Sequence, residues 1–352
     1  MLCKLSIGVI QAEFSDAALV LLGHGSTLDE DSGAAVFHQA AELRRRNLFA
    51  AVREAFWKQE PQVKQVLSTL AAPRVFIVPM FISEGYFSDT VIPRELGFQN
   101  VGVQAAGVQA LACPTANGAH NSVLRGPESD RKIKGSDGAA PCGPGPRTTE
   151  LCAPFAGDKL KLELQPNSWR VQARGSQKLI YCQPIGSHDS LAEVLMARAQ
   201  EVVESFPFPR PPAAKDTTLF IAGHGTEQNQ RSREAIERQT EVIRARDLYA
   251  DVQAVFLEES PRIGECYELA KTKNVVVVPF FISDGLHVKK DIPVMLGEPK
   301  RIVEQRLQHG QAAWRNPTER QGKLVWYSSS VGNAPQIAEV ILARVCEAAV
   351  WG

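Results

Sequence analysis

Residues 275–285 read VVVVPFFISDG and residues 75–85 read VFIVPMFISEG, so one motif occurs twice at an offset of 200 positions. Each copy opens with an apolar, largely β-branched run, which is typical of a strand covered on both faces. At the same offset, residues 16–97 align with residues 216–297 without a gap, with 26 identities in 82 positions. The chain therefore contains an internal duplication.

Short apolar runs alternate with stretches of helical spacing in each copy. The first runs, at 18–22 and 219–222, lead into Gly-His-Gly, and helical stretches follow at about 33–46 and 233–246. This alternation is typical of a parallel sheet with crossover helices. We expect an α/β fold of two tandem domains, each a small parallel sheet flanked by helices.

The two copies differ in length because the first carries an insertion. At the final strand and helix the offset falls from 200 to 146, which leaves 54 extra residues in the first copy. Residues 113–150 include 14 Gly, Pro or Ser in 38 positions, a composition typical of a mobile segment. We expect a first domain at 1–205 with its insertion at about 99–168, a proline-rich linker at 206–216 and a second domain at 217–352.

Composition excludes several classes of protein. The 39 acidic and 39 basic residues balance, so no net charge favours nucleic acid or an anionic membrane. No apolar run approaches the roughly 20 residues that span a bilayer, which predicts a cytoplasmic protein. The seven scattered cysteines never show Cys-x-x-Cys spacing and are interpreted as reduced thiols. A metal or iron–sulfur role stays open for Cys113, Cys142 and Cys152, which share one segment.

The second copy places one histidine after each of two strands. His224 follows the first strand within Gly-His-Gly, and His287 follows the third strand. Ligand sites of parallel sheets form beyond the carboxyl ends of the strands, so we expect the two histidines to be neighbours. Gly223 and Gly225 lack Cβ atoms and are candidate substrate-binding positions for a flat ligand. The alternative is an incidental turn histidine, which the recurrence of the motif in both copies makes weaker.

Two imidazoles without a third strong ligand bind a metal ion weakly, which suits a site that transfers the ion to another molecule. Neutral imidazoles bind divalent ions, and near neutral pH they accept protons. Insertion of a metal into a macrocycle requires both abilities, because two pyrrole protons leave as the ion enters. Lys289, Lys290 and Arg231 add positive charge near the histidines, which suits a polycarboxylate substrate. Solvated surface charge is the alternative interpretation.

Residues 278–293 read VPFFISDGLHVKKDIP, and together with Gly-His-Gly this stretch resembles the class II tetrapyrrole chelatases of the CbiX and SirB type. The resemblance covers both copies apart from the insertion and linker. It implies two flavodoxin-like or Rossmann-like domains that face each other, with the tetrapyrrole in the cleft. It also implies that His224 and His287 bind the metal and help to deprotonate the ring, with Asp291 in a supporting role.

The first copy departs from this pattern. His24 is retained as a further candidate metal ligand, but Phe87 stands in place of the second histidine. Phenylalanine neither ligates a metal nor accepts a proton, so the first copy cannot use two imidazoles. Glu84 is a candidate partner of His24, although Asp284 at the equivalent position favours a structural role shared by both acids.

The predicted function is ATP-independent insertion of cobalt(II) or iron(II) into a sirohydrochlorin-type tetrapyrrole in cobalamin or siroheme biosynthesis. The chain lacks a Gly-x-x-x-x-Gly-Lys-[Ser/Thr] loop, so we expect no nucleotide. An internal duplication favours a pseudo-dimeric monomer. Two alternatives stay open: a non-catalytic carrier of tetrapyrrole or metal, and a metal-dependent hydrolase with Asp284 or Asp291 as its third ligand.

Overall fold

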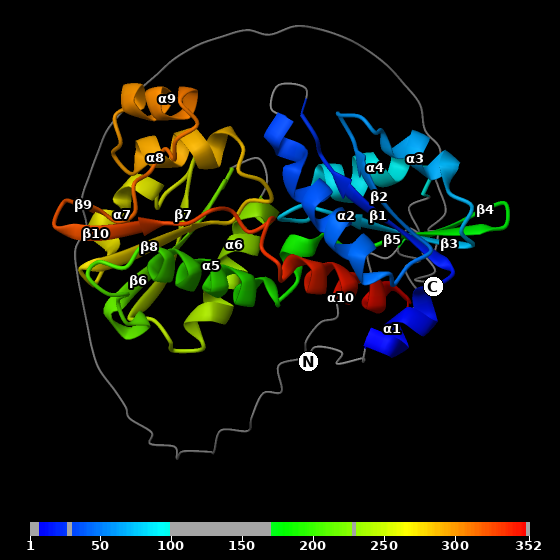
Figure 1. The fold of residues 1–352 in the computed structure, drawn as a ribbon, viewed down its shortest axis with the longest axis horizontal. Coiled ribbons are helices and arrows are strands. Elements are labelled where there is room, and N and C mark those ends of the chain that lie inside the picture. Colours follow the sequence, from blue (N-terminus) through cyan, green and yellow to red (C-terminus); the bar gives the residue numbers. More distant parts are fainter. Residues whose placement is uncertain (1–6, 27–29, 99–169, 227–229, 350–352) are drawn as a thin grey trace, which may run out of the picture. The chain divides into compact units, whose positions relative to one another are not determined.

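The structure is a computed structural model that describes residues 7–26, 30–98, 170–226 and 230–349. These residues form two halves, each built on a five-stranded sheet (Figure 1). Both halves belong to one compact unit, which comprises residues 1–101 and 166–352. The insertion predicted at about 99–168, with its three cysteines, lies outside the described residues.

The first half has the strand order β2-β1-β3-β5-β4. Its strands are β1 (Ala17–Gly23), β2 (Ala51–Phe56), β3 (Arg74–Pro79), β4 (Arg170–Arg174) and β5 (Gln177–Tyr181). Its helical elements are α1 (Ile7–Phe14), η1 (Glu30–Gly33), α2 (Ala34–Arg46), α3 (Val63–Thr69), η2 (Phe87–Val91), α4 (Ile92–Glu95), η3 (Ile185–Ser187) and α5 (Leu191–Ser205).

The second half repeats this order as β7-β6-β8-β10-β9. Its strands are β6 (Thr217–Gly223), β7 (Asp251–Phe256), β8 (Asn274–Pro279), β9 (Thr318–Arg320) and β10 (Lys323–Tyr327). Its helical elements are η4 (Ala214–Asp216), α6 (Gln230–Arg244), η5 (Ile263–Glu265), α7 (Cys266–Leu269), η6 (His287–Asp291), α8 (Ile292–Met295), α9 (Lys300–Gln308) and α10 (Ile337–Ala349).

Four strands of each sheet are parallel, which confirms the predicted α/β fold. β1 pairs with β2 and β3, β6 pairs with β7 and β8, and all seven residues of both central strands are buried. Central strands with both faces covered must be apolar throughout, and this explains their lack of alternation. The edge strands β4 and β9 are antiparallel to their neighbours and were not predicted. In both halves the chain leaves the central strand at Gly-His-Gly, which places this motif at the carboxyl edge of the sheet.

The last helix of each half packs on the sheet of the other half. α5 follows β5 of the first sheet but contacts β8, β10 and α6 of the second half. α10 follows β10 of the second sheet but contacts β3 and α2 of the first half (Figure 1). Each sheet therefore depends on a helix that the other half supplies.

Two buried arginines fasten the exchanged helices. Arg198 of α5 donates from Nε to the carbonyl oxygen of Ser330 at 3.0 Å. Arg344 of α10 donates from Nε to the carbonyl oxygen of Pro184, also at 3.0 Å. The two arginines are equivalent at the offset of 146. This helix exchange, in which each half receives the last helix of the other, therefore follows the internal symmetry of the chain.

Glycine is required in the turn that follows the last strand of each half, at Gly186 after β5 and at Gly332 after β10. Gln39 donates to the carbonyl oxygen of Gly332 at 2.9 Å, and Gln239 donates to that of Gly186 at 3.4 Å. A Cβ atom at Gly332 would lie 1.7 Å from the carbonyl oxygen of Ile282. Because that distance is far below any real contact, these turns exclude every residue with a side chain.

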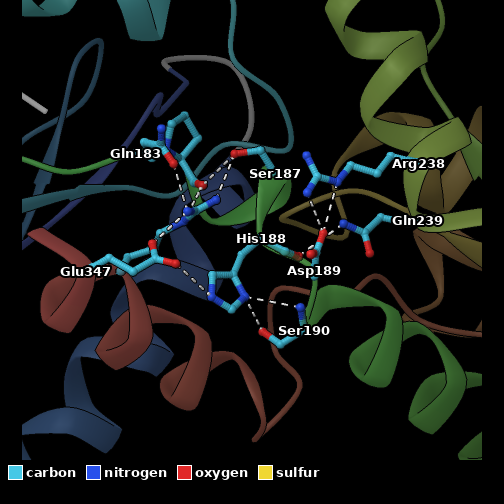
Figure 2. A network of polar contacts seen from close by, with 10 residues as sticks. Gln183, Ser187, His188, Asp189, Ser190, Arg238, Gln239 and Glu347 are labelled. Carbon is cyan, nitrogen blue, oxygen red and sulfur yellow. Dashed lines mark hydrogen bonds and ion pairs between the residues drawn. The ribbon is translucent and has the colours of Figure 1, made fainter. Parts of the chain in front are cut away.

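The turn before α5 joins elements of both halves, as Figure 2 shows. His188 contacts the Ser190 hydroxyl through Nδ1 at 2.6 Å, and its Nε2 lies 3.4 Å from Glu347 of α10. Burial acts to raise the pKa of Glu347, but the hydrogen bond from His188 and the charge of Arg344 outweigh burial and lower this pKa below its ordinary value. The turn at residues 186–189, which reads GSHD, is therefore part of the junction between the halves.

Candidate metal centre

His224 lies directly after β6, where the two flanking glycines fix the path of the chain. Gly225 has a φ of +57°, a conformation that side chains rarely adopt. A Cβ atom at Gly223 would lie 2.1 Å from Ile236 of α6, and one at Gly225 would lie 2.6 Å from Glu259. Side chains of the protein thus occupy the Cβ directions of both glycines, and packing is a sufficient reason for glycine at these positions.

His287 is the first residue of η6, a π-helix. Its Nδ1 lies 2.7 Å from Oδ2 of Asp291, one turn further along the chain. Its ring faces that of His224 edge to face, with 5.2 Å between the centroids and an angle of 82° between the planes. The strands therefore bring together two histidines that lie 63 positions apart in the sequence, as predicted. Both side chains remain partly exposed, so a ligand can approach them.

Glu258 is a third member of this cluster that the sequence analysis missed. Its carboxylate lies 3.8 Å from Nε2 of His224, and its backbone N–H donates to the carbonyl oxygen of His224. The equivalent position in the first half is Lys58. A basic residue in one copy and an acidic residue in the other is therefore the sequence signal that distinguishes Glu258. Within the described ranges, no group of three or more His, Cys, Asp or Glu side chains is arranged to hold a metal ion. The cluster is consequently an open pair of imidazoles with carboxylates beside it.

The first half has the same geometry with different chemistry. The ring of Phe87 faces that of His24 edge to face, with 5.6 Å between the centroids and an angle of 82°. Nζ of Lys58 lies 5.9 Å from the centroid of Phe87. Among the described residues, no ion pair joins His24 to Glu84, and a partnership of the two stays a prediction. This half therefore keeps the shape of the site but has one imidazole and a nearby positive charge.

The predicted substrate-binding cations have interaction partners within the protein. Arg231 forms an ion pair with Asp89 of the first half. Lys290 lies 2.8 Å from Glu304 of α9, and this contact raises the pKa of the lysine. Lys289 also has an interaction partner. A polycarboxylate would have to compete with these partners for the positive charges.

Asp284 has a structural contact. One of its carboxylate oxygens accepts a hydrogen bond from the backbone N–H of Ser330 at 2.8 Å, which ties the end of β8 to the turn after β10. Asp291 is likewise bonded to His287, as described above. One oxygen of each carboxylate is thus engaged within the protein.

The CbiX family model matches residues 18–128 and 218–348, and so covers a large part of both halves. The chain belongs to the CbiX family. A relative described as a probable sirohydrochlorin cobaltochelatase, from Halobacterium salinarum, is 34% identical over 332 residues, which are 94% of this chain and 91% of the relative. The sirohydrochlorin cobaltochelatase of Methanopyrus kandleri is 32% identical over 138 residues, which are 37% of this chain but 95% of the relative. The protein of Methanopyrus kandleri is therefore the shorter of the two, and nearly all of it corresponds to less than half of this CbiX-family chain.

Solved structures show the same fold. The multi-domain protein DR2241 of Deinococcus radiodurans, described as similar to chelatases, matches with a TM-score of 0.60 and 25% identity. That match covers 93% of this CbiX-family chain and 54% of DR2241, so the chain spans about half of its length. SirB of Bacillus subtilis, solved with Fe³⁺, matches with a TM-score of 0.56 and 13% identity over 95% of each chain. None of the described helices is both long and apolar enough to cross a membrane.

Proposed function

We propose that this chain inserts a divalent metal ion, cobalt(II) or iron(II), into a sirohydrochlorin-type tetrapyrrole. Membership of the CbiX family and the names of the relatives support this reaction class and substrate. The observation that carries the proposal is the facing pair of imidazoles, His224 and His287, at the carboxyl edge of the second sheet.

The reaction needs a weak metal site that also accepts protons. The ion replaces two pyrrole N–H protons, so the products are the metallated ring and two protons. A structural zinc site uses four protein ligands, whereas two imidazoles leave most positions of the ion open to ring nitrogens. Near neutral pH an imidazole that has released the ion can accept a pyrrole proton. The same two side chains thus serve both steps.

Two carboxylates support the imidazoles in different ways. Asp291 accepts a hydrogen bond from Nδ1 of His287, which leaves Nε2 of that ring with the lone pair that a metal requires. Glu258 places negative charge beside His224 and raises the local concentration of cations. Both acids are therefore assigned to delivery of the metal to the ring.

We propose that the first half forms the other wall of the tetrapyrrole site. Phe87 and Tyr86 expose aromatic surface next to His24, and such rings pack on flat conjugated ligands. Lys58 supplies a cation for a substrate carboxylate where the second half has an acid. The chain then acts as a pseudo-dimeric monomer in which only one wall carries a pair of imidazoles.

An anaerobic cobalt(II) metallation assay with sirohydrochlorin tests the proposal. We expect His287→Ala to lower kcat/KM by about 100-fold or more, because general base catalysis alone contributes about that much. The control is His309→Ala, which removes an exposed imidazole at the end of α9 and leaves both His224 and His287 in place. A His287→Ala variant that metallates the ring at the wild-type rate would overturn the assignment. Tight binding of metallated product without any acceleration over buffer would identify a carrier instead.

A further inference from the structure

A buried tyrosine supports the helix that carries His287. Tyr327, the last residue of β10, donates its hydroxyl hydrogen to the carbonyl oxygen of Val288 at 2.8 Å. Its side chain is only 8% exposed. Burial, followed by the negative charge of Asp284, raises the pKa of Tyr327 well above its usual value, so the hydroxyl stays protonated and able to donate.

The carbonyl oxygen of Val288 needs this donor because of the local helix geometry. In the π-helix η6 the backbone N–H of Ile292 donates to the carbonyl oxygen of His287, five residues earlier. The next bond of this kind would run from residue 293 to Val288, but residue 293 is proline and has no N–H. A buried carbonyl without a partner is strongly unfavourable, and the tyrosine hydroxyl supplies the missing donor.

The first half contains the same arrangement. Tyr181, the last residue of β5, donates to the carbonyl oxygen of Ser88 at 2.9 Å. Ser88 also lies five residues before a proline, Pro93, and follows Phe87 directly. The π-helix with its tyrosine is thus part of the duplicated scaffold, and only in the second half does it present an imidazole.

We propose that Tyr327 is a positioning residue for His287: its hydrogen bond to Val288 holds the π-helical turn that sets His287 edge to face against His224. The functional part of this inference rests on the proposed role of the imidazole pair in metal binding. Without the hydroxyl, the turn relaxes toward an arrangement that satisfies the Val288 carbonyl, and the residues on either side rotate. His287 then loses its alignment with both His224 and Asp291.

The test compares Tyr327→Phe with the matched control Tyr181→Phe in the full chain. Each variant removes one buried hydroxyl with the same kind of acceptor, so we expect a similar fall in Tm. Cobalt(II) alone serves as the ligand, and its binding is followed by visible absorption and calorimetry. We expect about tenfold weaker cobalt binding for Tyr327→Phe, in the range known for residues that orient metal ligands. For Tyr181→Phe we expect no change beyond twofold.

A rescue variant separates positioning from a general loss of stability. Adding Pro293→Ala to Tyr327→Phe restores a backbone N–H at residue 293, which can donate to the Val288 carbonyl in the π-helical register. We expect cobalt affinity to return to within threefold of the wild type. Equal cobalt affinities for the two single variants, or no recovery on rescue, would overturn the inference.

Hydrogen exchange provides a measurement that does not depend on metal. Peptides that span 285–296 and 85–96 report the two π-helical turns separately. We expect faster exchange at 285–296 only in Tyr327→Phe and at 85–96 only in Tyr181→Phe. If the wild type bound no cobalt, the proposed function would fail. Unchanged hydrogen exchange at 285–296 in Tyr327→Phe would instead contradict only the positioning role of Tyr327.

Discussion

The first half is predicted to become a second metal site after three substitutions. Phe87→His supplies the missing imidazole, Lys58→Glu replaces the cation with an acid, and Val91→Asp supplies a partner for the new ring. The ring of Phe87 already holds nearly the same place beside His24 as His287 holds beside His224, 5.6 Å against 5.2 Å between centroids and 82° in both cases. No rearrangement of the backbone is therefore required.

The expected magnitude follows from burial and charge. Phe87 is 42% exposed, so its replacement sacrifices only part of the roughly 1.5–3 kcal/mol that full burial of such a side chain contributes. A lysine charge about 6 Å from a dication opposes binding by about 1.4 kcal/mol in a water-like dielectric, which is about tenfold in affinity. Changing Lys58 to Glu reverses that contribution. We therefore expect Phe87→His alone to bind cobalt about 100-fold more weakly than the triple variant at low salt.

Calorimetric titration with cobalt(II) measures both stoichiometry and affinity. The wild type is expected to bind one equivalent and the triple variant two. In a His287→Ala background the triple variant should bind one equivalent again, now in the first half. A folded triple variant that binds no second equivalent would show that facing imidazoles with an adjacent acid do not define the site.

Three further predictions concern the junction between the halves. Gly332→Ala should prevent folding or lower Tm steeply, because its Cβ would overlap a carbonyl oxygen, and circular dichroism measures this loss. Glu347→Gln should lower stability at neutral pH but not in acid: the folded-state pKa of Glu347 is depressed, so its contribution is present above the ordinary glutamate pKa and disappears as pH falls through the lower value. Urea unfolding followed from pH 7 to well below the ordinary glutamate pKa tests this dependence, with His188→Ala expected to reduce it. Asp89→Asn should release Arg231 and lower the KM for the tetrapyrrole a few-fold, at a stability cost of at most about 1 kcal/mol, as for other exposed ion pairs.

The strands and the histidine pair could be predicted from sequence because the signals are local. A continuous apolar run such as Val275 to Pro279 indicates a strand buried on both faces whatever its neighbours are. Gly-His-Gly at the end of the first strand then fixes the edge at which His224 lies. His287 follows from the same rule, because parallel strands end at one edge of the sheet.

The features that the sequence does not reveal depend mostly on contacts between distant segments. β4 and β9 are short and contain no buried residue, so they lack the apolar pattern that marks a strand. The helix exchange leaves no trace in amphipathicity, because the apolar face of α5 is the same whichever sheet it covers. The contacts that surround Gly223 and Gly225, with Ile236 of α6 and with Glu259, are likewise visible only in the structure. Glu258 was visible as a charge reversal against Lys58, but it lies away from the recognised motifs.

The helix exchange makes the half without a second histidine structurally necessary. α5 leaves the first sheet and covers the second, so the half that carries His224 and His287 loses part of its core if the first half is removed. α10 makes the dependence mutual, because it covers the first sheet and is fastened there by Arg344. Phe87 in place of a histidine therefore changes the chemistry of the first half but not the structural requirement for that half. Substitutions that remove ligands from one half are tolerated by such an architecture, whereas deletion of that half is not.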